Sequence, residues 1–346
     1  MTAELMTAAY YRGNKTFTVQ ETPKTSPGAG EATIRIAYCG ICGTDMHIYH
    51  GNMDARVGDN RVIGHEMSGV IESLGEGVTG FELGQKVVVR PLDHCGECPA
   101  CEAGHTHICH NLKVLGIDTH GAMQEYWTIP AHTLHALPED LRLDHAALIE
   151  PLAVACHDVR LSELKAGEDV VVIGGGPIGI LVAMVARDAG GKVTISEVNE
   201  NRLAIAEKLG FETVNPIKTD LVEAINAKTD DKGADVAFEV SGTQPGVDAM
   251  TSVMASRGRI VMVAIHATKP NVDLFQFFWR ELKLLGARVY EPEDYDKAIS
   301  LISNGSIDCD TVITDVSPLS DVQAAFESLD ASPNAMKSLI KVGDLS

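Results

Sequence analysis

The alternation of apolar and polar positions divides the 346-residue chain into two kinds of region. Up to about residue 150, short alternating runs are separated by glycine-containing turns. The clearest of these runs are Ala32–Ala37, Val62–Glu72 and Gln85–Arg90. Runs of this length with a period of two are typical of β-strands, so we expect a compact and mostly antiparallel β region here.

After about Ala155, apolar strands alternate with helical segments. The pattern predicts strands at Val170–Ile173 and Val193–Glu197, with helices that end near Ala189 and Leu209. Three more strands are expected in this region, at Ala234–Val240, Arg259–Ala264 and Lys283–Val289. Strands that alternate with helices at this spacing form βαβ units and a parallel sheet. The chain then leaves this pattern, beginning with a predicted helix over residues 294–303.

Length and charge limit the kinds of protein this chain can be. A chain of 346 residues is longer than one hydrophobic core usually serves, which favours two domains. The formal net charge of −20 argues against nucleic acid or an anionic membrane as a partner. We expect no membrane span, because no apolar run reaches about 18 residues. The longest candidate, Ile173–Val185, is interrupted by glycine and proline.

The N-terminus and the cysteines predict a cytoplasmic location. No basic segment followed by an apolar one opens the chain, so we expect no signal peptide. Four of the eight cysteines lie within fifteen residues. In a cytoplasmic protein such a cluster is typical of metal binding, whereas a secreted disulfide scaffold spreads its cysteines through a short chain.

A glycine-rich loop follows the strand Val170–Ile173 and opens a helix. Its sequence fits G-x-G-x-x-G, with Gly174 for the tight turn, Gly176 for the approach of a pyrophosphate and Gly179 for close packing of helix against strand. Pro177 and Ile178 complete the loop. A dinucleotide diphosphate is expected at the helix N-terminus, where free N–H groups and the helix dipole favour an anion.

An acidic residue stands where such a loop needs one. Glu197 closes the second predicted strand, about twenty residues after the loop, and is expected to bind the adenosine ribose hydroxyls. A carboxylate at this point would repel a 2′-phosphate, which favours NAD over NADP. Arg202 either lies over the adenine side of the cofactor or is a solvated helix residue.

Four thiols are close together in one loop: Cys95, Cys98, Cys101 and Cys109. Four sulfurs around one tetrahedral ion leave no position open for a substrate, which is the arrangement of a structural zinc site. An iron–sulfur cluster and disulfides are the alternatives. The four histidines of this region exceed what such a site needs, and we interpret them as surface residues.

Three separate segments carry further metal-ligand chemistry. They are the run from Cys39 to His47, the tripeptide Gly64-His65-Glu66, and Glu150-Pro151. Each segment alone is a weak signal. Together with the cysteine loop and the glycine loop, and in this order, they resemble the zinc-containing medium-chain dehydrogenases. The likeness covers essentially the whole chain and is greatest to the polyol, butanediol and threonine dehydrogenases.

The resemblance implies a catalytic zinc site in addition to the structural one. Cys42 and His65 would bind the ion directly, and Glu66 would bind it directly or exchange with water. Glu150 would contact the zinc or its bound water, at a point where other alcohol dehydrogenases carry a second cysteine. A carboxylate in place of a thiolate leaves a more exchangeable site. Asp45 resembles the acid that orients a zinc-bound histidine.

The same resemblance implies the reaction. A secondary alcohol, a polyol or a vicinal diol, would lose a hydride to NAD and become a ketone. Thr44 would take the hydroxyl proton and His47 would accept it at the solvent end, because a histidine pKa lies near physiological pH. The expected cofactors are therefore NAD and two zinc ions per subunit.

The resemblance also implies an architecture. We expect an α/β protein with a GroES-like β domain formed by residues 1–155 and 291–346. A doubly wound Rossmann domain over residues 156–290 would bind NAD. The last strand of that domain can pair with another subunit, so a homo-oligomer, a tetramer or a dimer, is expected.

The substrate stays open at this level. Polyol dehydrogenases often carry a Phe-Arg-Tyr-like run after the last sheet strand, and here Val289 stands at the arginine position. Glu150-Pro151-Leu152 resembles the butanediol and polyol group more than the threonine dehydrogenases. Two alternatives remain: an L-threonine 3-dehydrogenase-like enzyme, and a non-catalytic NAD-binding protein. The second would have lost a zinc ligand or a relay residue, and none of these is missing.

Overall fold

The computed structural model describes residues 4–332 and 334–345. The chain divides into two compact units. The first unit consists of Met1–Glu150, Glu291–Gly305 and Val312–Ser346. The second consists of Pro151–Tyr290 and Ser306–Thr311.

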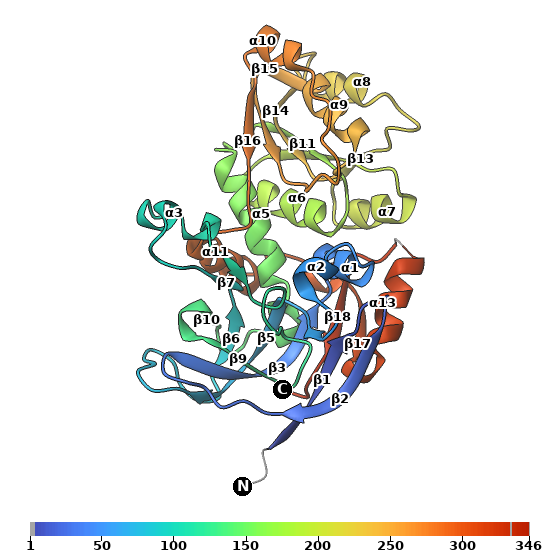
Figure 1. Cartoon of the computed structure of the whole chain (residues 1–346). Helices are drawn as coiled ribbons and strands as arrows, with labels where there is room; N and C mark the ends of the chain where they lie inside the picture. The colour runs from blue at the N-terminus through green and yellow to red at the C-terminus, as the bar shows by residue number, and fades with distance from the viewer. Residues whose placement is uncertain (1–3, 333, 346) are drawn as a thin grey trace. The chain divides into compact units, whose positions relative to one another are not determined.

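A seven-stranded sheet forms the framework of the first unit, with the strand order β10-β6-β5-β3-β18-β17 and β9 paired to β3 (Figure 1). Its neighbouring strands are antiparallel except β17 and β18, which are parallel. The strands are β3 (Glu31–Gly40), β5 (Glu66–Leu74), β6 (Lys86–Val89), β9 (Tyr126–Pro130), β10 (Leu134–Ala136), β17 (Ile313–Pro318) and β18 (Lys337–Lys341). The expectation of a mostly antiparallel β region is therefore confirmed.

Smaller elements complete the first unit. Two small sheets contain β1 (Leu5–Tyr11), β2 (Phe17–Pro23) and β4 (Arg61–Val62), and β7 (Leu92–Asp93) and β8 (Lys113–Val114). The helices are α1 (Gly43–Tyr49), α2 (Asp54–Val57), α3 (Pro99–Glu102), α4 (Leu143–Ala146), α11 (Pro292–Ser303) and α13 (Val322–Ala331), with 3-10 turns at Thr106–Ile108, Ala131–Thr133 and Leu319–Asp321. Two further helices, α5 (Ile149–Leu161) and α12 (Cys309–Val312), lie where the chain passes between the units.

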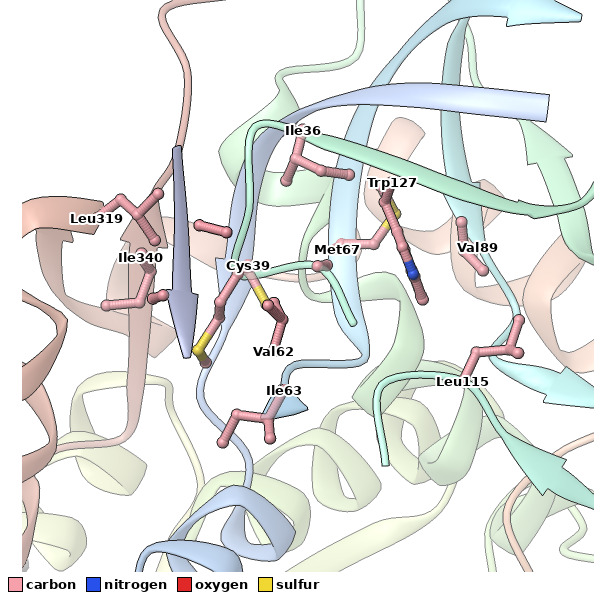
Figure 2. Close-up of a cluster of buried hydrophobic side chains, with 14 of the residues drawn as sticks. Ile36, Cys39, Val62, Ile63, Met67, Val89, Leu115, Trp127, Leu319 and Ile340 are labelled. Carbon is pink, nitrogen blue, oxygen red and sulfur yellow. The ribbon is translucent and has the colours of Figure 1, made fainter. Parts of the chain in front are cut away.

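The core of the first unit gathers side chains from strands that are far apart in sequence (Figure 2). Ile36 on β3, Met67 on β5 and Ile340 on β18 are all essentially inaccessible to solvent. Trp127 on β9 packs in the same cluster, and its indole N–H donates to the carbonyl of His120 at 2.7 Å. Each such apolar side chain contributes about 1.5–3 kcal/mol by leaving water. This burial fixes the strands whose ends carry the site.

Several predicted strands differ in extent from the observed ones: β15 begins at Met254 rather than Arg259, β16 ends at Gly286 rather than Val289, and the largest change is at residues 62–72. The apolar pattern suggests a single strand over Val62–Glu72, but β4 ends at Val62 and β5 begins only at Glu66. Gly64 lies between them with a φ of +101°, in the left-handed region that favours glycine. The break leaves His65 outside both strands, directly before β5.

A six-stranded parallel sheet forms the second unit, in the order β13-β12-β11-β14-β15-β16. The strands are β11 (Asp169–Ile173), β12 (Lys192–Ser196), β13 (Glu212–Val214), β14 (Ala234–Glu239), β15 (Met254–Met262) and β16 (Lys283–Gly286), and the helices are α6 (Pro177–Asp188), α7 (Glu200–Lys208), α8 (Leu221–Lys228), α9 (Gln244–Ser252) and α10 (Leu274–Arg280). The strand order reverses direction between β11 and β14. This is the doubly wound arrangement expected from the sequence, and the reversal is where such sheets bind nucleotides.

The buried centre of this sheet explains why its strands are readable in the sequence. Val172 on β11 and Phe238 on β14 have no exposed surface. Helix α6 is apolar along most of its length and buries eight of its twelve residues. Three-residue β13 and helices α8 to α10 have weaker patterns and were not expected individually. Within the described part of the chain, no helix combines the length and the apolar character needed to cross a membrane.

Candidate functional site

Three potential metal ligands meet at the ends of β3 and β5 in the first unit. One ligand atom each of Cys42, His65 and Glu66 lies within 4.8 Å of the others. Cys42 is the residue before the first turn of α1, just after β3. Glu66 is the first residue of β5 and is paired in register with Gly40 of β3. The antiparallel pairing of these two strands therefore brings the three side chains together.

A buried carboxylate, that of Asp45, contacts two segments of this cluster. Asp45 has no exposed surface, and one of its oxygens accepts a hydrogen bond of 2.9 Å from the backbone N–H of Cys42. Its other oxygen lies 3.7 Å from Nδ1 of His65. Asp45 thus caps helix α1 and faces the histidine at the same time. Burial raises the pKa of Asp45 above its usual range.

The electrostatics of the cluster favour a cation. Burial opposes a charge on His65, but Asp45 and the Cys42 thiol outweigh it, so the pKa of His65 is raised. Nδ1 of His65 and Oδ1 of Asp45 are buried and have no hydrogen-bond partner among the described residues. Thiolate, imidazole and carboxylate are also the ligands that zinc takes in proteins. The residues therefore fit a zinc ion.

The remaining residues expected at this site lie near it with different exposure. Glu150 is the second residue of α5 and is buried. It is outside the set of mutually close ligand atoms found in the described chain. Its charge nevertheless helps to raise the pKa of His65. Thr44 is half-buried and His47 is exposed, three residues apart on α1, so they share one side of that helix.

The four cysteines of the loop form a second, separate cluster in the first unit. The sulfur–sulfur distances are 3.5 Å for Cys98–Cys101, 3.8 Å for Cys98–Cys109 and 3.4 Å for Cys109–Cys95. Sulfurs around one tetrahedral zinc ion, each bound at about 2.3 Å, are about 3.8 Å apart. All four cysteines are free, which excludes the disulfide alternative. The cluster therefore fits one structural zinc ion.

Backbone groups of the same loop prepare these sulfurs to carry charge. The N–H of His110 donates to the sulfur of Cys98 at 3.4 Å, and the N–H of Asn111 donates to Cys109 at 3.3 Å. The hydrogen bond from His110 is the main cause of the lowered pKa of Cys98. Among the nearby histidines, His107 is buried rather than on the surface, with Nδ1 3.4 Å from a carboxylate oxygen of Glu291.

The glycine loop of the second unit has the geometry expected of a phosphate-binding turn. Gly174 has a φ of +105°, and a Cβ there would lie 2.9 Å from the backbone nitrogen of Ser241. Gly176 is the residue before α6, and Pro177 and Ile178 begin the helix. A Cβ on Gly179 would collide with the carbonyl of Gly174. Close packing thus requires glycine at positions 174 and 179. Gly176 stands at the free N-terminus of the helix.

Glu197 lies directly after β12 and is held by the backbone. Its Oε2 accepts a hydrogen bond of 2.7 Å from the N–H of Gly175, and its Oε1 accepts from Val198 at 2.7 Å and from Asn199 at 2.8 Å. Arg202 is nearby, with Nη1 3.9 Å from Oε2 of Glu197. Gly174, Gly176, Glu197 and Arg202 all line one cavity of about 330 Å³ in the second unit.

Sequence reasoning missed Lys337, which forms an ion pair with Glu66. Lys337 begins β18, 271 positions beyond Glu66, and no motif connects the two residues. The signal in the sequence is a lysine two positions before the apolar pair Leu339-Ile340, in a segment that is otherwise suited to a buried strand.

Two family models match the chain. Residues 28–139 match the alcohol dehydrogenase GroES-like domain, and residues 177–304 match the zinc-binding dehydrogenase model. The first match lies in the first unit and includes the cysteine loop together with Cys42, His65 and Glu66. The second begins at the glycine loop.

Relatives extend the likeness over the whole chain. The chain is 58% identical over 336 residues to the 2-dehydro-3-deoxy-L-galactonate 5-dehydrogenase of Pseudoalteromonas atlantica, covering 97% of this chain and 98% of that protein. A crystal structure of 2R,3R-butanediol dehydrogenase from Bacillus subtilis superposes with a TM-score of 0.91 at 30% identity, covering 98% and 100% of the two chains. A zinc-binding dehydrogenase of Sinorhizobium meliloti 1021 bound to NADP superposes with a TM-score of 0.92 at 31% identity, with the same coverage. The chain therefore belongs to the zinc-dependent medium-chain dehydrogenases, as its motifs predict, and is an oxidoreductase of that family.

Proposed function

We propose that this enzyme oxidises a secondary hydroxyl of a sugar acid to a ketone and passes the hydride to NAD. The observation that carries the proposal is the convergence of Cys42, His65 and Glu66 in a chain that is 58% identical to a sugar-acid 5-dehydrogenase. Polyols and vicinal diols are the wider substrate class within which this choice falls.

Residues of the first unit have different roles toward the hydroxyl group of the substrate. Cys42, His65 and Glu66 would hold the catalytic zinc, and Glu150 would contact the ion or its bound water. When bound, zinc lowers the pKa of a coordinated alcohol so that its proton is released near neutral pH. Asp45, whose Oδ1 lies 3.7 Å from Nδ1 of His65, would orient the ring of a zinc-bound His65, as a carboxylate beside a ligating histidine does.

A short relay removes the proton. Thr44, half-buried on α1, accepts it from the substrate hydroxyl, and His47, exposed on the same side of the helix, passes it to water. An imidazole suits the last position because its unperturbed pKa lies close to physiological pH. The order of exposure along the helix, from Thr44 to His47, supports this direction.

In the second unit, Gly174, Gly176, Pro177, Ile178 and Gly179 bind the dinucleotide diphosphate at the N-terminus of α6. A free helix N-terminus offers N–H groups and a favourable dipole to an anion.

Glu197 accepts the adenosine ribose hydroxyls, and Arg202 lies beside the same part of the cofactor. The carboxylate of Glu197 is fixed by three backbone N–H groups, so it cannot turn away from a 2′-phosphate. This supports NAD over NADP, although one related structure holds NADP.

The remaining part of the proposal concerns domains and assembly. A GroES-like catalytic domain of residues 1–155 and 291–346, with a Rossmann domain of residues 156–290, is supported by compact units that divide at Glu150 and Tyr290.

A homo-oligomer, a dimer or tetramer, is supported by α10, which buries none of its residues and exposes Phe278 and Trp279. Strand β16 is also an edge of the sheet. Sedimentation of the purified protein tests the assembly. A cytoplasmic location is supported by the four free thiols of the cysteine loop, which form no disulfide with one another.

The test is a set of initial rates of NADH formation. The substrates are 2-dehydro-3-deoxy-L-galactonate, 2R,3R-butanediol, a sugar alcohol and L-threonine, each with NAD and with NADP, before and after treatment with a chelator. We expect fastest turnover of the sugar acid with NAD, and its loss after chelation. Preference for L-threonine or for NADP would contradict the corresponding part of the proposal. Absence of turnover with every substrate, with NADH still bound, would favour the non-catalytic alternative.

A further inference from the structure

A lysine is buried directly beside the candidate catalytic metal ligands. Lys337 opens β18 and is 4% exposed, and Glu66 is 1% exposed. The ammonium group of Lys337 forms an ion pair with Oε2 of Glu66. It also donates a hydrogen bond of 3.2 Å to the carbonyl of Ile41, the residue before Cys42. One side chain thus touches one metal ligand and the backbone next to another.

The fold makes room for this pair. Strand β3 lies between β5 and β18, and Gly40 of β3 is opposite Glu66 on one side and Leu339 on the other. A Cβ on Gly40 would collide with the carboxylate of Glu66 and lie 3.3 Å from Cε of Lys337. The absence of a side chain at residue 40 therefore leaves the space in which the two charged groups meet across β3.

A buried ion pair such as this one contributes little to the stability of the fold. Removing a lysine and a carboxylate from water carries a large desolvation penalty for each ion, and their attraction often does no more than offset it. Apolar residues of similar volume would hold β18 against β3 equally well. The cost is explained if Lys337 acts on Glu66 as part of the metal site.

We propose that Lys337 is a positioning residue that keeps Glu66 a weak, exchangeable ligand of the catalytic zinc. The inference rests on the proposed function, since it takes Cys42, His65 and Glu66 as the ligands. Lys337 engages Oε2 of Glu66, and its positive charge would make that oxygen a weaker ligand for the ion. Its positive charge also lowers the affinity of the whole site for a divalent cation, and both effects leave a coordination position open for the substrate.

The proposal predicts that replacing the buried Lys337 makes the catalytic zinc leave more slowly, whereas most substitutions beside a metal site make it leave faster. In Lys337→Met, Glu66 is released toward the ion with both oxygens and without a competing cation. The catalytic zinc should then leave to a chelator more slowly than in the parent, by about 10–100-fold, the range found for groups that support metal ligands. Turnover should fall because the open position is occupied, whereas Lys337→Arg should restore much of both properties.

The experiment measures zinc release to a colorimetric chelator, together with kcat and KM. The four-cysteine zinc serves as an internal reference, and its release should be the same in every variant. The matched control is Lys341→Met, which makes the same substitution on the same strand at an exposed lysine paired with Asp344. It should release both ions as the parent does. In Lys337→Met/Glu66→Gln, the slow release should disappear, because the released carboxylate is gone.

A purely structural role gives the opposite result. If Lys337 only holds β18 in place, Lys337→Met will loosen the cluster, and the catalytic zinc will leave faster than in the parent. That outcome, or unchanged release, would overturn the inference while leaving the proposed function intact. If the parent protein binds only one zinc ion, or keeps its turnover after losing the second, the proposed function itself fails. A variant that does not fold is replaced by Lys337→Gln, judged by the same release rate.

Discussion

The four thiols of the cysteine loop come from fifteen consecutive residues, whereas Cys42, His65 and Glu66 come from the ends of two strands and the start of a helix. In the loop, local turns and backbone N–H groups place the sulfurs. In the other site, the pairing of β3 with β5 places the ligands, and neighbouring elements supply Asp45 and Lys337. The first arrangement closes around its ion and serves stability. The second depends on the pairing of strands in the sheet, and its proposed role is catalytic.

The largest effect should come from removing a ligand at the second arrangement. Cys42→Ser should lower turnover by at least about 100-fold, because a hydroxyl is a much poorer zinc ligand than a thiolate. Bound zinc should fall from two ions to one, and NADH titration should be unchanged because the glycine loop belongs to the other unit. Cys39→Ser, a substitution of the buried neighbour whose sulfur is outside the ligand set, should keep both ions. Normal turnover in Cys42→Ser would contradict the metal assignment.

The corresponding change in the cysteine loop should act on stability. Cys98→Ser should lower the melting temperature by on the order of 10 °C, because metal binding at such a site is folding free energy. The kcat of the molecules that remain folded should be close to that of the parent. Calorimetry combined with rates corrected for folded fraction tests this. A large fall in kcat with an unchanged melting temperature would remove the distinction between the two sites.

The sequence predicted most where structure is local. The glycine loop and the cysteine loop each lie within one short stretch of sequence. Their geometry can therefore be predicted from the spacing of the glycines or of the cysteines alone. The parallel sheet was also predictable, because its central strands are buried on both faces and appear as continuous apolar runs. Edge elements such as β13 have only three residues and no comparable signal.

The sequence predicted least where distant strands meet. Cys42, His65 and Glu66 could be grouped only by resemblance to a family, since no spacing states that β3 pairs with β5. Lys337 could not be found at all, because its meaning depends on β18 lying next to β3 and on the space left by Gly40. The break at Gly64 was missed for a related reason: an alternating pattern does not record a positive φ in a residue without a side chain.

Two glycines give the mildest test of the same difference. Gly64 and Gly104 both have a positive φ, of +101° and +87°. A Cβ on Gly64 would lie 2.5 Å from the sulfur of Cys39 and 3.1 Å from Cγ of Met123, whereas a Cβ on Gly104 would meet no atom within 4 Å. Gly104→Ala therefore adds backbone strain alone and should cost about 1 kcal/mol. Gly64→Ala adds overpacking and should cost about 2–4 kcal/mol.

Urea unfolding measures these costs, and counting bound zinc shows where they act. Gly64→Ala should also lower occupancy of the catalytic ion, because the strained turn carries His65, while Gly104→Ala should leave both ions bound. Equal costs, or loss of the cysteine-bound ion in Gly104→Ala, would contradict the difference in how the two sites are held. The cysteine loop can tolerate a local change because its four ligands lie within fifteen consecutive residues. The strand-end site cannot, because its ligands come from two separate segments that are brought together by the pairing of β3 with β5.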